Sequence, residues 1–334
     1  MMALGIGLFI AALAATWLAT GLVIRLLNRQ SILDHPTNRS SHTVPTPRGG
    51  GLAVVPIVVV TWLIAVWILG DKSPGPSVLW ALAGGVLLGW VSWRDDIHGL
   101  PVIWRLAVHI LVVALVLFST EFSASFTRGL LPLWLEYPLA AFLLLWFLNL
   151  FNFMDGIDGI SGIETTCVGL GCAGVAWASG NHEWIGVLGL SIAGAGIGFL
   201  RWNWQPAKIF LGDVGSIPLG FLLAWLLLAL AAEGAWAAAL ILPLYYLGDA
   251  TVTIVRRATR GERIWEAHRE HFYQQAARRD GGHARVSIAV AIANLVLIGL
   301  AIWSLDKPLP AVAAAILVVA LFLIYLAKSG RPAQ

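Results

Sequence analysis

Long runs of apolar residues recur along this chain and restrict it to a membrane-embedded fold. Hydrophobic residues make up 59% of its 334 residues and charged residues only 12%, and the mean hydropathy is +0.82. Soluble domains carry about 25% charged residues, whereas a helix of about 20 apolar residues crosses the hydrocarbon core of a bilayer. The sequence therefore predicts an all-α polytopic membrane protein, with residues 1–334 forming one integral membrane domain.

Eleven runs have the length of a transmembrane helix. Their expected bounds are 3–24, 51–69, 76–92, 104–119, 138–154, 162–179, 184–200, 214–231, 235–255, 286–304 and 308–327. The first run is too long for the apolar core of a secretory signal and follows no basic segment, so we expect it to be retained. Cys167 and Cys172 fall inside one run, where we interpret them as packing residues and not as a disulfide or metal pair.

The distribution of basic residues predicts the orientation in the membrane. If the N-terminus is outside, 18 of the 21 lysines and arginines lie in cytoplasmic segments, and only Lys72, Arg128 and Lys307 lie outside. The positive-inside rule then places the C-terminus in the cytoplasm. No soluble basic domain is present to bind nucleic acid. We expect the active-site face to consist of the cytoplasmic loops 25–50, 93–105, 152–162, 201–213 and 256–285.

Three acidic clusters stand at the expected cytoplasmic ends of the apolar runs. They read WRDDIHG at 93–99, NLFNFMDGIDG at 149–159 and IFLGDVGS at 209–216. An ionised carboxylate near hydrocarbon is costly unless it faces water, a cation or a metal. Three such clusters on one membrane face predict a divalent-metal site that handles a phosphorylated substrate.

The adjacent carboxylates of the first cluster predict a catalytic pair. Asp95 and Asp96 cannot both be comfortably ionised without a cation or a proton, so one can serve as a base and the other as its electrostatic partner. The alternative is an acidic helix end that pairs with Arg94.

The second cluster places polar side chains at every third position. Asn152 and Asp155 can share a helix face, as can Asp155 and Asp158, and Gly156 and Gly159 are expected to break the helix there. In the third cluster Asp213 begins an apolar run, where a plain N-capping role is the alternative. Oxygen ligands from Asp213 and Asn152 would suit Mg²⁺, or Mn²⁺ in its place.

Two basic loops complete the candidate site. Residues 34–51 contain PTPRGGG, in which Arg48 precedes three glycines whose N–H groups could approach an anion. Residues 256–285 contain His268, Arg269 and His271, followed by Phe272 and Tyr273. These side chains could bind a diphosphate and stack on a base or sugar, although a solvated basic loop is the plainer interpretation. Asp249 lies inside an expected span, and we expect it to pair with a neighbouring helix.

Taken in order, PTPRGGG, the DD pair, NFMDGIDG with LGDVGS, and the HREH segment resemble the polyprenyl-phosphate N-acetylhexosamine-1-phosphate transferases (glycosyltransferase 4 family). The resemblance covers essentially the whole chain. The wordings RSSHTVPTPRGGG and HREHFYQ look most like the O-antigen initiator branch, in which the sugar is often a 6-deoxy-N-acetylhexosamine. The muramoyl-pentapeptide branch usually has three consecutive histidines, and this chain does not.

The resemblance implies a transferase in the bacterial inner membrane that moves a sugar 1-phosphate from a UDP-N-acetyl sugar to undecaprenyl phosphate. FucNAc, QuiNAc and GlcNAc are the candidate sugars, and a homodimer is left open. The resemblance implies that Asp213, with Asn152 or Asp155, holds Mg²⁺. Asp95 and Asp96 would orient the lipid phosphate, Arg105 would hold it, and Asp158 would lie near the uridine or the reactive phosphate. The remaining substrate contacts would come from Arg48, Lys208, His268, Arg269 and His271.

Two other classes of protein fit part of the pattern. A cation- or proton-coupled transporter also buries acidic residues, but it usually places them near the membrane midplane in repeated, broken helices. An intramembrane prenyltransferase also uses aspartate-bound Mg²⁺, but here Asp95 and Asp96 are followed by no third aspartate at the expected spacing. Both remain alternatives from the sequence alone, as does a paralogue that binds lipid without turnover.

Overall fold

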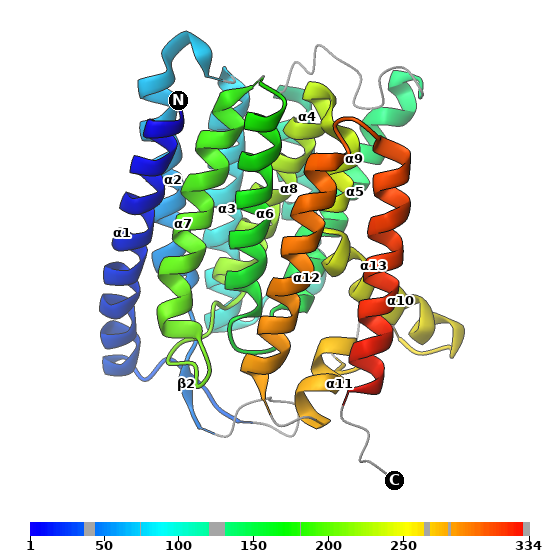
Figure 1. Cartoon of the computed structure of the whole chain (residues 1–334). Helices are drawn as coiled ribbons and strands as arrows, with labels where there is room; N and C mark the ends of the chain where they lie inside the picture. The colour runs from blue at the N-terminus through cyan, green and yellow to red at the C-terminus, as the bar shows by residue number, and fades with distance from the viewer. Residues whose placement is uncertain are drawn as a thin grey trace.

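The computed structural model describes residues 1–36, 44–73, 75–119, 131–180, 182–263, 268–279 and 282–329. Parts of the predicted loops 25–50 and 256–285 therefore lie outside the described residues. The long helices run side by side as a bundle, with the N-terminus and the C-terminus at opposite ends (Figure 1).

The described elements are almost all helical. The helices are α1 Met2–Arg29, α2 Gly51–Leu69, α3 Pro76–His98, α4 Val102–Ser119, α5 Leu133–Met154, α6 Ile160–Ala178, α7 Glu183–Asn203, α8 Asp213–Leu230, α9 Trp236–Ile241, α10 Leu244–Thr259, α11 Phe272–Arg279, α12 His283–Trp303 and α13 Pro308–Lys328. A 3₁₀ turn, η1, covers Gly70–Lys72, and a π-helical segment, η2, covers Ala231–Ala235. The strands β1 Leu33–Asp34 and β2 Thr46–Pro47 pair antiparallel.

Nine helical stretches among the described residues are long and apolar enough to cross a membrane, and α4 is a shorter apolar helix. The all-α polytopic fold predicted from the sequence is thereby confirmed, and ten of the eleven expected runs correspond to helices. The run at 235–255 does not form one helix. It divides into α9 and α10 around Leu242 and Pro243, because proline has no N–H to donate and its ring disfavours a continuing helix.

Helix α8 forms the axis of the bundle. Each of its residues after Asp213 is buried, and the indole ring of Trp225 packs on Trp62 from α2 and Trp184 from α7, with ring centroids 5.8 and 6.1 Å apart. Such a helix, apolar on all sides, is expected only where neighbouring helices surround it completely.

Small residues let α7 approach α1 closely. A Cβ atom added at Gly194 would overlap the backbone oxygen of Phe9, and one at Gly198 would overlap that of Leu13. These two glycines therefore serve close helix packing. Cys167 and Cys172 are buried in α6 as free thiols, as expected.

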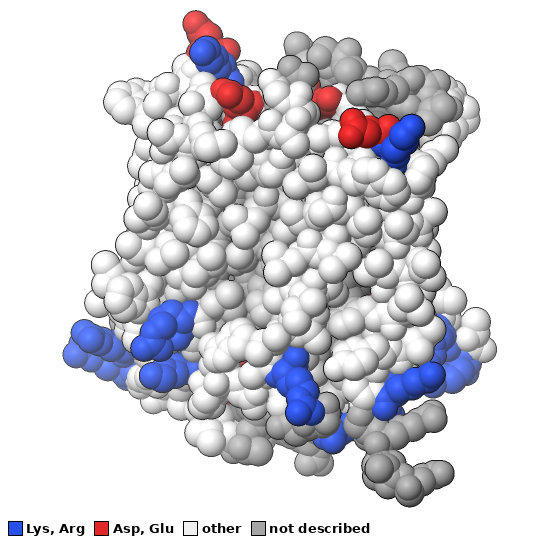
Figure 2. Space-filling model, in the orientation of Figure 1, with Lys and Arg blue, Asp and Glu red and all other residues white. Residues whose placement is uncertain are grey.

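Charge separates the two ends of the bundle. On the face drawn in Figure 2, most lysine and arginine side chains gather at the end that holds the last turns of α1, α7 and α13, whereas the other end shows acidic side chains together with a few basic ones. We refer to the first as the basic end. The first residues of α8 and the last residues of α3 and α5 lie at this end, which brings all three acidic clusters to it.

Candidate functional site

The carboxylates of α3 and α8 meet around two arginines. The Nη2 atom of Arg48 lies 2.6 Å from Asp213 Oδ1 and 3.0 Å from Asp96 Oδ1. Arg105 Nη1 lies 2.6 Å from Asp95 Oδ2 and 4.0 Å from Asp213 Oδ2. Residues 48, 95, 96, 105 and 213, far apart in the sequence, thus form one charged cluster.

Backbone hydrogen bonds fix Arg48 against the segment that precedes α8. The N–H of Phe210 donates to Pro47 O at 2.9 Å, and the N–H groups of Gly49 and Gly50 both donate to Phe210 O, at 3.1 and 2.8 Å. The N–H of Gly51 donates to Leu211 O at 2.9 Å. The expectation that these three glycine N–H groups receive an anion is therefore wrong, because carbonyl oxygens of the protein already occupy them.

Glycine is needed at these positions for close approach. A Cβ atom at Gly51 would overlap the backbone of Gly215, so the start of α2 touches the start of α8 directly. Gly212 has a φ of +73°, and a Cβ atom there would lie 3.1 Å from Asp96 Oδ2. The GGG and LGDVG sequences therefore join two helix starts at a separation that side chains would prevent.

The two adjacent carboxylates have different environments. Asp95 accepts hydrogen bonds from the Leu100 N–H and from Arg105, both at 2.6 Å. Asp96 accepts the N–H of Val214 in the first turn of α8 at 3.1 Å. Their charged partners are thus Arg105 and Arg48, and the alternative in which Arg94 neutralises the pair is not what the structure shows.

The 152–158 segment does not form the single helical face that its spacing predicted. Helix α5 ends at Met154, so Asn152 is helical whereas Asp155 and Asp158 lie on the turn before α6. Gly156 and Gly159, the latter with a φ of +83°, allow this turn. The expected helix break is confirmed. The predicted sharing of one helix face by Asn152, Asp155 and Asp158 is wrong, because the helix ends before Asp155.

Asn152 and Asp155 each accept one hydroxyl hydrogen bond. Ser216 from α8 donates to Asn152 Oδ1 at 2.6 Å, which joins α5 to α8. Ser161 from α6 donates to Asp155 Oδ1 at 2.7 Å. Burial raises the pKa of Asp155 to about 6 despite this hydrogen bond, so its carboxyl group can change protonation close to neutral pH.

Asp158 joins three segments. Its Oδ2 accepts the Ala207 N–H at 3.1 Å, and its Oδ1 lies 3.2 Å from His283 Nδ1 at the start of α12. Its backbone oxygen accepts the hydroxyl of Ser287 at 2.8 Å. This mostly buried carboxylate therefore ties the turn before α6 to the segment before α8 and to α12, and its predicted contact with a substrate stays a prediction.

The oxygen donors fit a hard divalent cation. Asp96 and Asp213, from two helices, both contact the same guanidinium nitrogen of Arg48, so their oxygens converge on one positively charged centre. No group of three or more acidic, histidine or cysteine side chains that could hold a metal occurs in the described ranges. Mg²⁺ commonly takes only one or two carboxylates, and water and phosphate oxygens complete its shell. The predicted ligand Asn152 contacts Ser216, one turn along α8 from Asp213.

The predicted donor-binding residues differ in how far they are buried. His268 and Arg269 are half-buried, whereas His271 is only 2% exposed. Burial lowers the pKa of His268 to about 4, so its ring is neutral at pH 7. Tyr273 is fully buried, and its hydroxyl donates to Phe153 O at 3.1 Å. The expectation that Tyr273 stacks on a base or sugar is therefore wrong.

Lys208 lies beside an aromatic ring. Its ammonium nitrogen is 5.5 Å from the ring centroid of Trp202, and the guanidinium of Arg201 is 5.8 Å from the same ring. The indole N–H of Trp202 donates to the backbone oxygen of Trp17 in α1 at 2.8 Å. The substrate contact predicted for Lys208 stays a prediction.

Several residues that organise the site carried no distinctive signal in the sequence. Asn203 accepts the Gly159 N–H and donates to Ile209 O, both at 2.9 Å, and so ties the turn before α6 to the segment before α8. Ser161, Ser216 and His283 act similarly. Each is a single polar residue at the end of an apolar run, a pattern too common to be informative alone.

Comparison with known proteins agrees with this arrangement. Residues 78–231, which contain all three acidic clusters, match glycosyl transferase family 4. The chain is also 28% identical over 312 residues to the probable undecaprenyl-phosphate N-acetylglucosaminyl 1-phosphate transferase of Bacillus subtilis (strain 168), covering 88% of this chain and 85% of the relative. The chain is thus similar to glycosyl transferase family 4 over residues 78–231, the part that carries the acidic clusters, and to the Bacillus protein over most of its length.

Proposed function

We propose that this protein transfers an N-acetylhexosamine 1-phosphate from a UDP-sugar to undecaprenyl phosphate and releases UMP. The observation that carries the proposal is the convergence of Asp95, Asp96 and Asp213 with Arg48 and Arg105 at the ends of membrane-embedded helices. The Bacillus relative, whose name specifies undecaprenyl phosphate and the transfer of an N-acetylglucosaminyl 1-phosphate group, supports it.

The location of the cluster suits two substrates of opposite solubility. A polyprenyl chain stays in the bilayer, whereas a nucleotide sugar stays in water, so the two can meet only at an interface. The carboxylates lie at helix ends beside basic loops, which attract phosphorylated groups. By the positive-inside rule the basic end would face the cytoplasm, and we propose the inner membrane of a bacterium as the location of the enzyme.

The proposed reaction is a phosphoryl transfer. An oxygen of the lipid phosphate forms a bond to the β-phosphorus of the UDP-sugar, the bond between that phosphorus and the bridging oxygen breaks, and UMP leaves with both bonding electrons. Arg105, which is held by Asp95, would bind the lipid phosphate. A guanidinium can then offset the negative charge that develops on the transferring group.

A divalent cation belongs to this proposal. Asp213 and Asp96 would hold Mg²⁺, or Mn²⁺, with Asn152 nearby, and the ion would neutralise the diphosphate and polarise the transferring phosphoryl group. Arg48 pairs with both carboxylates, so we expect it to turn toward the substrate phosphates when the ion is bound. Asp158 and Asp155 would line the floor beneath the donor.

The sugar and the pathway form the finer part of the proposal. The motif wordings favour an initiator of O-antigen or another cell-surface polysaccharide, with a 6-deoxy-N-acetylhexosamine as the donor sugar. The relative's name instead specifies N-acetylglucosamine. We therefore propose a UDP-N-acetylhexosamine donor and test its members individually.

The test is a UMP-release assay with purified protein, undecaprenyl phosphate and separate UDP-GlcNAc, UDP-GalNAc, UDP-FucNAc and UDP-QuiNAc donors. We expect one donor to release UMP in the presence of Mg²⁺ or Mn²⁺, and EDTA to stop the release. No UMP from any donor, with protein that remains folded, would contradict the proposal. Exchange of labelled UMP into the UDP-sugar without lipid would indicate a covalent enzyme intermediate, whereas exchange only with lipid would indicate direct displacement.

A further inference from the structure

A buried carboxylate, Asp249, holds the start of α11 although it belongs to α10. Its side chain is 0% exposed. Asp249 Oδ1 accepts the N–H of Phe272 at 3.0 Å, and Oδ2 accepts the N–H of Tyr273 at 3.1 Å. These are the first two amides of α11, which have no partner within their own helix. Asp249 therefore caps α11 from a different helix.

The same carboxylate fixes His271. The Nδ1 atom of His271 lies 3.2 Å from Asp249 Oδ1, and both side chains are buried. Because this carboxylate already accepts two backbone N–H groups, the hydrogen in the His271 contact comes from the imidazole ring. This hydrogen bond holds the His271 ring inside the protein, where the ring stacks on that of His268 with centroids 4.8 Å apart.

Asp249 is held in turn by its own helix. The hydroxyl groups of Tyr245 and Thr253, one turn before and one turn after Asp249, donate to it at 3.4 and 3.3 Å. Five donors thus surround one carboxyl group. A buried carboxylate with this many donors is satisfied in the ionised state, and it loses several partners at once when it is replaced.

Helix α11 rests on the turn that carries Asp155. The hydroxyl of Tyr273 donates to Phe153 O at 3.1 Å, and a Cβ atom at Gly156 would overlap that hydroxyl. Asp249 fixes the position of α11, and α11 in turn contacts the backbone of residues 153–156, which includes Asp155.

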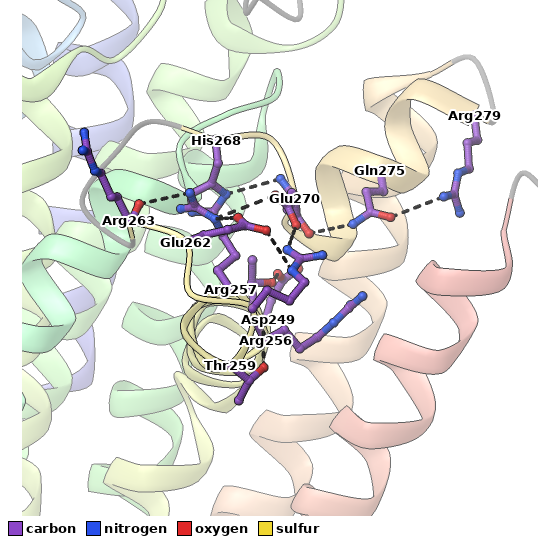
Figure 3. A network of polar contacts seen from close by, with 12 residues as sticks. Asp249, Arg256, Arg257, Thr259, Glu262, Arg263, His268, Glu270, Gln275 and Arg279 are labelled. Atoms are coloured by element: carbon purple, nitrogen blue, oxygen red, sulfur yellow. Dashed lines mark hydrogen bonds and ion pairs between the residues drawn. The ribbon is translucent and has the colours of Figure 1, made fainter.

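Ion pairs close the other side of the HREH segment. Arg257 Nε lies 2.9 Å from Glu262 Oε2 and 3.8 Å from Glu270 Oε1, and Arg260 pairs with both glutamates. Figure 3 shows this network between the end of α10 and the start of α11. His268 touches both sides of this arrangement, because its ring stacks on His271 and its Nδ1 atom accepts the N–H of Glu270 at 3.3 Å.

We propose that Asp249 is a positioning residue for the nucleotide-sugar donor, acting through His271 and α11. This positioning role rests on the proposed function, since it assumes that His268 and Arg269 contact the donor diphosphate. His271 then holds His268 in place by stacking and does not itself contact the donor. The lipid phosphate, in contrast, is assigned to Arg105 in the charged cluster, which is a different part of the site.

The test compares Asp249→Asn with Asp306→Asn, which makes the same chemical change at an exposed position at the opposite end of the bundle. An amide presents one oxygen where the carboxylate presents two, so one set of N–H donors loses its acceptor in either orientation. We expect the KM for the UDP-sugar to rise about tenfold or more, from the loss of a buried charged hydrogen bond, and the KM for undecaprenyl phosphate to stay within twofold. Asp306→Asn should change neither.

Hydrogen exchange supplies a readout that is independent of turnover. In Asp249→Asn the amides of residues 268–279 should exchange faster, while those of α6 and α8 keep their protection. Equal changes in both KM values, or an unchanged UDP-sugar KM with a lowered kcat, would overturn the proposal. If Asp249→Asn does not fold, Tyr273→Phe, which removes only the hydrogen bond to Phe153, must raise the UDP-sugar KM selectively; an unchanged KM then counts against the proposal.

Failure of the proposed function would look different. If the wild-type protein shows no UMP release and no binding of any UDP-sugar, the function is wrong irrespective of Asp249. If the wild-type protein uses a UDP-sugar and Asp249→Asn uses it equally well, only the positioning role is wrong.

Discussion

The contact between Gly51 and Gly215 gives the sharpest test of how the site is built. In Gly51→Ala, the new Cβ atom would lie 2.2 Å from both the Cα and the N atom of Gly215 and 2.5 Å from the carbonyl carbon of Val214. Ordinary contact of a Cβ atom begins at 3.4 Å, so one of the two helix starts must move by about 1.2 Å to restore it. No flexible side chain can absorb the overlap, because the atoms opposite belong to the backbone.

That displacement has two measurable consequences. Overpacking of this kind costs about 1–3 kcal/mol of stability. Since Asp213 lies two residues before Gly215, its carboxylate moves with the start of α8, and a misplacement of about 1 Å at a reacting centre can lower turnover by about 100-fold. We expect Gly51→Ala to unfold at a lower temperature in detergent and to release UMP about 10 to 100 times more slowly.

A matched control separates this effect from the general one of replacing glycine by alanine. A Cβ atom at Gly7, in α1, meets no atom of the described residues within 4 Å. Alanine in a helix is favoured over glycine by about 0.5–1 kcal/mol, so Gly7→Ala should be neutral or slightly stabilising with normal turnover. If Gly51→Ala behaves like Gly7→Ala in both unfolding and turnover, the close approach of α2 and α8 does not position Asp213 as we argue.

Three further substitutions test individual side chains. Asp213→Asn should lower UMP release at least about 100-fold at every Mg²⁺ concentration; normal turnover at high Mg²⁺ would remove Asp213 from the proposed metal site. Burial raises the pKa of Asp155 from 3.8 to about 6, so this group binds its proton more tightly in the folded protein. Its stabilising contribution is complete below about pH 4 and is lost as the pH rises through about 6. In Asp155→Asn, the unfolding temperature measured between pH 4 and 8 should lack this pH-dependent contribution, and an unchanged pH dependence would contradict the raised pKa of Asp155. Because burial lowers the pKa of His268 to about 4, its ring donates and accepts hydrogen bonds at pH 7 without charge, so His268→Gln should keep more UDP-sugar affinity than His268→Ala, and equal losses in the two variants would refute this reasoning.

The sequence was sufficient for the fold class and for most helices because apolar length determines both. The run at 235–255 was misread because its composition is almost entirely apolar, while Pro243 interrupts its backbone and Gly234 bends the chain just before it. Gly234 has a φ of +98° inside η2, a conformation that hydropathy does not report. The break matters because α10, which begins after it, carries Asp249.

The sequence also predicted which residues form the site, but it did not predict the contacts among them. Asp95, Asp96 and Asp213 were predicted to lie together, and Arg48 and Arg105 hold them together in the structure. Spacing alone placed Asp155 on the helix of Asn152, because three-residue intervals cannot show that the helix ends at Met154. His271 and Tyr273 looked like substrate contacts because a charged loop was assumed to be exposed. Their burial depends on Asp249 and Phe153, which are distant in sequence.

The central place of α8 has a consequence for how the protein responds to its membrane. Lipids would contact peripheral helices such as α1 and α13, many of whose large apolar side chains are exposed, whereas α8 beyond its first residue is enclosed by other helices. A thinner or thicker bilayer is accommodated by tilting the helices that contact it. The helix that carries Asp213 at its start is therefore the part of the molecule best insulated from such changes, and we expect turnover to vary little between vesicles of different acyl-chain length.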